Sequence, residues 1–492
     1  MPVYRIRRIG KGLLAGAAAC SLVACAAAPG GAVAAGTPIT QTEAQQGAQY
    51  HPEFVAEFGG AMTGPQADYV EQVGKNIAVQ SGLANSQSAF TVTLLNSPVN
   101  NAFAVPGGYV YVTRQLVGLM NNEAELAGVL GHEVGHVAAR HSARRQQTAQ
   151  RNQILGVLGQ VLSGVILGDS ALGRLGSELA STAPQLATLS YSRNQELEAD
   201  QLGVEYLLRA GYDPRAMSTV LQSLAAQTAL DARIQGADAT VPEWASTHPD
   251  PASRVNNAAR LAGQGTGITN RDTFLTRING LMYDDDPAQG VVDGNSFIHP
   301  DLRLSFAVPQ GFYMVNGTRA VSINGNAGRA QFSTAPYSGN LEGYVSQVFG
   351  AIGGQTPLSP QAIQRTTVNG LPAAYGTARV ASGQQNVDVV VFAYEFAPNQ
   401  AYHFAALAPA GGAGVFNPLF NSMRRLSNAE AAQVVPRRIE VVTAARGDTV
   451  QTLASRMAYS NAQQERFRVL NGLSASDQVV PGQMYKIVVR GS

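Results

Sequence analysis

One pentapeptide constrains the fold of this chain more than any other feature: HEVGH, at residues 132–136. On an α-helix, its histidines His132 and His136 lie on the same face, one turn apart, where both imidazoles can reach one cation. Glu133 lies beside them, where its carboxylate can take a proton from water at that cation. A helix is favoured because Asn122 is a candidate N-cap with Glu125 three residues later, before a stripe of apolar residues. The pattern predicts a metal-binding helix.

A second segment supplies the third protein ligand that a zinc site needs. Ser192 and Gln195 form a candidate capping box, so Glu196 enters a second helix. Glu196 and Asp200 are four residues apart and share one face of that helix. One carboxylate can bind the metal while the other holds a ligand imidazole by its second nitrogen. We therefore expect Glu196 as the third ligand.

Two neighbouring residues are weaker ligand candidates. Glu198 points about 200° away from Glu196 around the helix. His141 follows the first helix and is expected on the surface of the next turn rather than at the metal.

Together, HExxH and the later Glu-Leu-Glu-Ala-Asp run resemble the gluzincin metallopeptidase family of CAAX prenyl proteases and HtpX, in its soluble periplasmic branch. The resemblance covers about residues 46–265 and implies a mainly helical zincin-type fold. It implies Zn2+ held by His132, His136 and Glu196, with the fourth position open to water and Glu133 as general base. The substrates it implies are unfolded or misassembled envelope proteins. Long spanning helices, as in the membrane-embedded members, are not expected.

The same resemblance implies a role for a histidine outside both motifs. His248 stands in a Thr-His-Pro context, in a loop before a helix that Asp250 caps and Pro251 opens. In similar periplasmic proteases such a histidine occupies the open zinc position, so His248 is expected to be a fourth, displaceable ligand of a latent enzyme. The alternative is that His248 caps the helix or packs beside Trp244. Arg254, one turn into the helix, is expected to steady an oxyanion or a carboxylate.

A short alternating segment precedes the metal helix and predicts a substrate-binding edge strand: Asn101, Ala102, Phe103 and Ala104. An edge strand can align an extended peptide by main-chain hydrogen bonds. Similar segments in other gluzincins imply that Asn101 holds the substrate backbone. Simple turn chemistry at Asn-Ala and Pro-Gly is the alternative.

Residues 1–24 differ in kind from the rest of the chain. A basic start without acidic residues is followed by an apolar stretch, 13–24, that suits a signal-peptide core. The stretch ends Leu-Val-Ala-Cys, which resembles the bacterial lipobox, so lipid is expected on Cys25. Residues 25–45 read as a flexible tether. Ala26, and not Asp, follows Cys25. By analogy with bacterial sorting rules, we expect the protein to be anchored on the periplasmic side of the outer membrane. A soluble export signal is the alternative.

Changes in composition predict an α+β multidomain chain. We expect a metallopeptidase domain with a short edge-strand sheet at 46–285, a β-containing α+β domain of unknown role at 290–428, and a small βααβ module at 436–491. The apolar run 154–167 is too short to span a bilayer and predicts a core or surface-docking helix.

The C-terminal module resembles a LysM domain through its Gly-Asp-Thr segment at 447–449, its Asn-Gly pair at 471–472 and its Pro-Gly pair at 481–482. The resemblance implies binding to peptidoglycan; a purely structural module is the alternative. A net charge of +1 gives no support for a nucleic-acid partner. The sequence thus favours a periplasmic zinc endopeptidase. A zinc peptidoglycan hydrolase and a catalytically silent, chaperone-like binding protein remain open.

Overall fold

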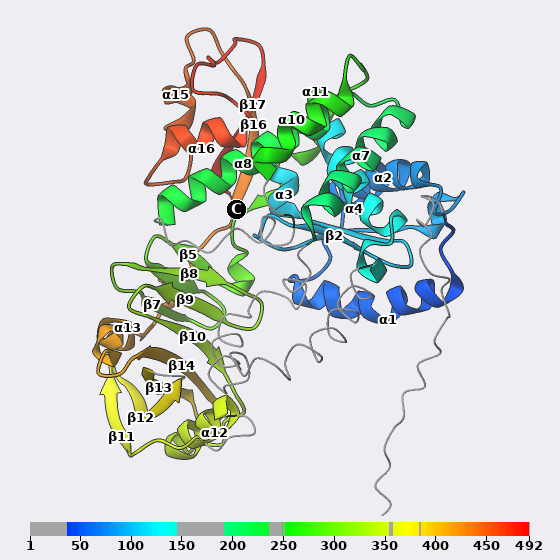
Figure 1. The fold of residues 1–492 in the computed structure, drawn as a ribbon. Helices are drawn as coiled ribbons and strands as arrows, with labels where there is room; N and C mark the ends of the chain where they lie inside the picture. The colour runs from blue at the N-terminus through cyan, green and yellow to red at the C-terminus, as the bar shows by residue number, and fades with distance from the viewer. Residues whose placement is uncertain are drawn as a thin grey trace, which may run out of the picture.

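The computed structural model describes residues 37–144, 191–235, 248, 251–353, 358–382 and 385–491. Several predictions fall outside these residues: the leader 1–24, the lipid-bearing Cys25, the apolar run 154–167, Trp244 and the N-cap Asp250. The α+β multidomain prediction is confirmed, because a mainly helical region is followed by β-rich regions (Figure 1). None of the described helices is both long and apolar enough to cross a membrane.

The first region is built on a three-stranded sheet of order β1-β3-β2, in which β1 runs parallel and β2 antiparallel to β3. Helices α2 and α4 pack against this sheet (Figure 1). The ring of Phe54, from α1, packs against Phe103 and Tyr111. The elements are α1 (Gln41–Glu57), α2 (Pro65–Ala78), β1 (Thr91–Leu95), β2 (Ala102–Val105), β3 (Tyr109–Thr113), α3 (Arg114–Leu119), α4 (Glu123–Ala138), α7 (Arg193–Arg209), α8 (Ala216–Gln235), α10 (Pro251–Ala262) and α11 (Arg271–Ile278).

Helices α4 and α7, which carry the two motifs, pack side by side. Small residues allow this close approach. A Cβ atom added at Gly203 would lie 2.4 Å from Met217 Cε and 3.2 Å from the backbone nitrogen of His132. The glycine therefore lets α7 pass directly beside the metal-binding turn of α4.

The middle region is built on two antiparallel sheets. One sheet has the order β11-β12-β13-β14-β10-β9-β8, with α12 against β12 and β13; the other has the order β15-β7-β6-β5. The elements are β5 (Val291–Asp293), β6 (Ser296–His299), β7 (Leu304–Ala307), β8 (Phe312–Asn316), β9 (Val321–Gly325), β10 (Gly328–Thr334), α12 (Leu341–Gly353), β11 (Ile363–Val368), β12 (Leu371–Ser382), β13 (Gln385–Ala397), β14 (Gln400–Pro409), α13 (Asn417–Ser422), β15 (Arg424–Arg425) and α14 (Asn428–Ala432).

The C-terminal module has the strand–helix–helix–strand order that the sequence predicts: β16 (Arg437–Thr443), α15 (Val450–Ala454), α16 (Gln463–Leu470) and β17 (Met484–Arg490). Its β16 also pairs with β4 (Met282–Tyr283), and α16 packs on α8. The apolar side chains of the module belong to the same buried cluster as those of the first region. The module therefore shares its core with the helical region.

A run of three aspartates joins the three regions. Asp284 accepts hydrogen bonds from Arg437 and Tyr459 of the C-terminal module. Asp285 accepts from the side chain of Asn316 in the middle region. Asp286 accepts from the side chain of Asn96, which follows β1, at 2.7 Å.

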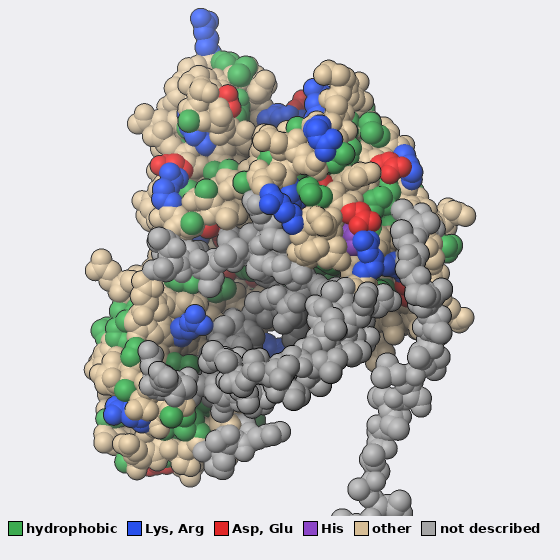
Figure 2. Space-filling view, viewed as in Figure 1, with side chains coloured by type: hydrophobic (Ala, Val, Ile, Leu, Met, Phe, Trp, Pro, Cys, Tyr) green, Lys and Arg blue, Asp and Glu red, His purple; other side chains and the backbone are tan. Residues whose placement is uncertain are grey.

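On the face drawn in Figure 2, Lys and Arg side chains are scattered among Asp and Glu side chains. A near-neutral, mixed surface of this kind favours no polyanionic partner.

Candidate metal centre

Four side chains from three segments converge in the interior. His132 and His136 come from α4, Glu196 comes from α7, and His248 precedes α10; one ligand atom from each lies within 4.8 Å of all the others. His132 Nε2 is 3.0 Å from His136 Nε2 and 3.3 Å from His248 Nδ1. All four side chains are buried. Three imidazoles and one carboxylate aimed at one point form a donor set that suits Zn2+.

The helices that carry these ligands begin as the sequence predicts. At the start of α4, Asn122 Oδ1 accepts from the Glu125 backbone N–H at 2.9 Å. Only half of the predicted capping box forms, because the Glu125 carboxylate accepts from the Asn121 backbone instead. At the start of α7, Ser192 and Gln195 form both hydrogen bonds of a capping box.

The second nitrogen of His132 contacts a carboxylate. Its Nδ1 is 3.0 Å from Asp200 Oδ1. Arg254 donates to both oxygens of Asp200, at 2.8 and 2.5 Å, and also to Glu196. Burial raises the pKa of Asp200, but the hydrogen bonds from Arg254 and His132 outweigh it and hold that pKa at about 2. Of the two roles expected for Arg254, the geometry favours steadying carboxylates.

Glu133 lies beside the cluster and is buried. Burial raises the pKa of its carboxyl group to about 8. Within the described part of the chain, no donor makes a hydrogen bond to its Oε1, which is 3.5 Å from His248 Nε2. A buried oxygen without a hydrogen-bond partner is costly, and such atoms gather at functional sites.

The expectation that His141 lies on the surface is wrong, because its side chain is fully buried. The chain turns back after α4 and places the His141 ring 4.9 Å from the His136 ring, centre to centre. Tyr191 also stacks on His136, at 3.8 Å between ring centres. The spacing of HExxH carries no signal for either contact, because both depend on how the chain runs outside the helix.

The predicted substrate segment forms a sheet edge. β2 is the outer strand of the three-stranded sheet and packs beside α4 (Figure 1). Ala102 and Ala104 face the core shared with α4, while Phe103 stacks on Tyr111 at 4.6 Å between ring centres. Asn101, just before the strand, is buried, and its backbone oxygen accepts from the backbone of Thr113.

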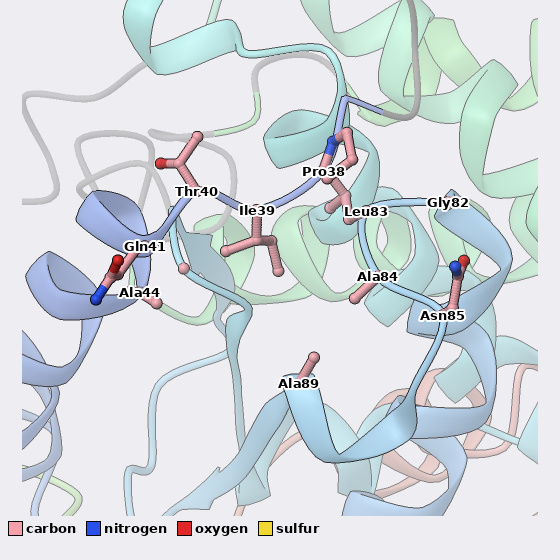
Figure 3. Close-up of a pocket in the computed structure, with 11 residues that line it drawn as sticks. Pro38, Ile39, Thr40, Gln41, Ala44, Gly82, Leu83, Ala84, Asn85 and Ala89 are labelled. Atoms are coloured by element: carbon pink, nitrogen blue, oxygen red, sulfur yellow. The ribbon is translucent and has the colours of Figure 1, made fainter.

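A pocket of about 430 Å³ lies apart from these side chains (Figure 3). It is lined by the segment that leads into α1, the loop after α2 and the turn at Gly107. None of its lining residues is ionisable. Its lining side chains therefore offer no acid or base for catalysis.

Comparison with known proteins agrees with this geometry. Residues 65–262 match peptidase family M48. The chain is 36% identical over 200 residues to the beta-barrel assembly-enhancing protease of Yersinia pestis, covering 40% of this chain and 39% of that protein. For the same-named protease of Escherichia coli K12, identity is 33% over 223 residues, covering 44% and 43%. For the mitochondrial metalloendopeptidase OMA1 of Arabidopsis thaliana, it is 35% over 167 residues, covering 34% and 30%.

The chain spans about two fifths or less of the length of these curated relatives. The similarity therefore concerns one domain rather than whole proteins. That domain contains both predicted motifs, and its His132, His136 and Glu196 converge with His248 in one buried cluster that fits zinc. Residues 65–262 are a metallopeptidase domain of family M48.

Proposed function

We propose that this protein is a zinc-dependent endopeptidase of the bacterial periplasm that cleaves unfolded or misassembled envelope proteins. The observation that carries the proposal is the buried convergence of three histidines and Glu196 beside the carboxylate of Glu133. Family M48 and the relatives named as metalloendopeptidases support proteolysis. The bacterial relatives are beta-barrel assembly-enhancing proteases, and this supports an envelope role.

The chemistry divides among a few side chains. When bound, Zn2+ supplies Lewis-acid polarisation of the scissile carbonyl and makes water more acidic. Glu133 takes the proton from the attacking water and passes it to the leaving amine. Asp200 and Arg254 act on the ligands: Asp200 orients His132, and Arg254 fixes the carboxylates of Asp200 and Glu196.

The edge strand favours an extended substrate. Ala102, Phe103 and Ala104 lie in β2, the outer strand of the sheet beside α4. Asn101 precedes this strand, and its own backbone groups are already bonded to Thr113. A peptide added to this edge must be free of its own secondary structure. Unfolded proteins meet that requirement, whereas folded β-barrel proteins do not.

Cleavage of an unfolded protein tests the proposal. The purified chain is expected to cleave reduced casein, to lose activity with a chelator and to regain it with Zn2+. Release of muropeptides from purified sacculi, with casein left intact, would instead establish a peptidoglycan hydrolase. Tight zinc binding without cleavage of either substrate would establish a silent binding protein.

We expect His248 to keep the isolated enzyme largely latent. His248 Nδ1 lies 3.1 Å from Glu196 Oε1 and 3.3 Å from His132 Nε2, so it stands among the ligand atoms. If the closed state holds about nine tenths of the molecules, His248→Ala should raise casein cleavage about tenfold. His299→Ala, in the middle region, is the matched control and should change nothing. Unchanged or lower activity of His248→Ala, with zinc content intact, would contradict the latch.

The proposed anchor is lipid on Cys25. Cys25→Ser is expected to move the protein from the membrane pellet to the soluble periplasmic fraction, because acyl chains contribute about 0.8 kcal/mol per buried CH2. A mutant that still sediments with outer membranes after a salt wash would place the anchor elsewhere.

We also propose that residues 436–491 bind peptidoglycan. Failure of the full chain to sediment with purified sacculi would leave the module a structural role.

A further inference from the structure

The chain reverses direction directly after α4. Arg140 adopts a left-handed backbone conformation, with φ of 55°, which is unfavourable for a residue with a side chain. Its guanidinium is held by an ion pair with Glu43 and by the carbonyl oxygens of Thr37 and Pro38, each at 3.3 Å. The reversal turns the next side chain, His141, back toward the last turn of α4. Strained backbone conformations of this kind cluster at functional sites, and the contacts of His141 indicate which function this turn serves.

His141 links a metal ligand to a carboxylate. His136 Nδ1 is 2.8 Å from His141 Nδ1, and His141 Nε2 is 3.2 Å from Glu198 Oε2. Arg144 holds the carboxylate of Glu198 at 3.0 and 3.2 Å. The other nitrogen of His136, Nε2, points into the cluster, 3.4 Å from Glu196 Oε1.

The direction of each hydrogen bond follows from these positions. A ring nitrogen that binds metal offers its lone pair, so His136 carries its proton on Nδ1 and donates it to His141. His141 then accepts on Nδ1 and donates from Nε2 to the carboxylate of Glu198. The chain of bonds favours one tautomer of His136, the one that leaves Nε2 available.

We propose that His141 and Glu198 are positioning residues that hold His136 ready for zinc. This inference rests on the proposed zinc enzyme. The two ligand histidines are then supported from the same helix: Asp200 reaches His132 directly, and Glu198 reaches His136 through His141. Outer partners of this kind orient a ligand imidazole and raise its basicity.

Zinc affinity, measured by competition with a chromophoric chelator, tests the relay. His141→Leu removes both hydrogen bonds at similar volume and is expected to weaken zinc binding about 10- to 100-fold. His141→Asn is expected to recover much of this loss, because its Oδ1 takes the place of Nδ1 and accepts from His136. Glu198→Gln removes the charge at the end of the relay and is also expected to weaken zinc binding.

Glu205→Gln is the matched control. Glu205 lies on the same helix, its side chain is 46% exposed against 44% for Glu198, and it is also paired with an arginine, Arg209. This variant is expected to bind zinc like the unmodified protein. Thermal unfolding of the zinc-free proteins separates positioning from folding, because a positioning role leaves the zinc-free melting temperature of Glu198→Gln unchanged.

Three outcomes overturn the inference. Unchanged zinc affinity in both His141→Leu and Glu198→Gln is the first, and it would leave the proposed enzyme intact. Equal losses in Glu198→Gln and Glu205→Gln are the second. Failure of the unmodified protein to bind zinc is the third, and it would remove the proposed function as well. If His141→Leu does not fold, Glu198→Gln carries the test because its side chain is partly exposed.

Discussion

Replacing Glu133 with Gln is expected to abolish proteolysis while zinc stays bound. The amide keeps the shape of the side chain but cannot accept the proton of the attacking water, and such a base contributes about 10²- to 10⁴-fold in rate. The measurement is kcat/KM on casein together with zinc content by elemental analysis. Glu196→Ala is the contrasting variant, because removing a ligand should remove the zinc itself. Casein cleavage by Glu133→Gln near the unmodified rate would mean that another group is the base.

The same substitution has an expected effect on the metal-free protein. Burial raises the pKa of Glu133 from an ordinary 4.5 to about 8, so between these pH values the folded chain holds a proton that the unfolded chain releases. The stability that this carboxyl contributes is complete below pH 4.5 and is lost as pH rises through about 8. Metal-free Glu133→Gln should therefore gain stability over the unmodified protein as pH rises from 5 to 8. Denaturant unfolding at both pH values measures the difference.

Local sequence patterns predict those parts of the centre that depend on one helix at a time. His132 and His136 share a face by helix geometry, and Ser192 fixes where α7 begins. Glu196 and Asp200 then project together because they are one turn apart. The strand–helix–helix–strand order of the C-terminal module is likewise predicted by local patterns in its sequence.

Contacts between distant segments are not readable in this way. The burial of His141 depends on the left-handed backbone of Arg140, a conformation that an arginine does not favour. Its partner Glu198 is the weaker ligand candidate because of its direction around the helix, and that same direction brings it to His141. The shared core of the C-terminal module is equally hidden, because its periodic apolar residues predict burial without saying against what.

The buried Lys486 shows how the C-terminal module joins the metal-binding region. Its ammonium donates to the backbone oxygens of Gly118, Leu119 and Met120, at the C-terminal end of α3. A cation is favoured there by the helix dipole. Burial lowers the pKa of Lys486, and the carboxylate of Glu125, in the first turn of α4, opposes that lowering. Lys486 therefore braces the turn from which the metal-binding helix starts.

Replacing Lys486 with Met is accordingly expected to lower the free energy of unfolding by about 1–3 kcal/mol, because the buried backbone oxygens of Gly118, Leu119 and Met120 lose their donor. Arg490→Met on the same strand is the matched control; its side chain is 50% exposed and pairs with Asp293, so its loss should stay below about 1 kcal/mol. Denaturant unfolding gives both values.

The module and the helical region share one core, so they are expected to unfold in a single transition. Lys486→Met should therefore lower one common denaturant midpoint, that of the module and of α4 with its zinc site. Separate unfolding of the module, at a denaturant concentration where zinc stays bound, would show instead that residues 436–491 stand apart from the peptidase core.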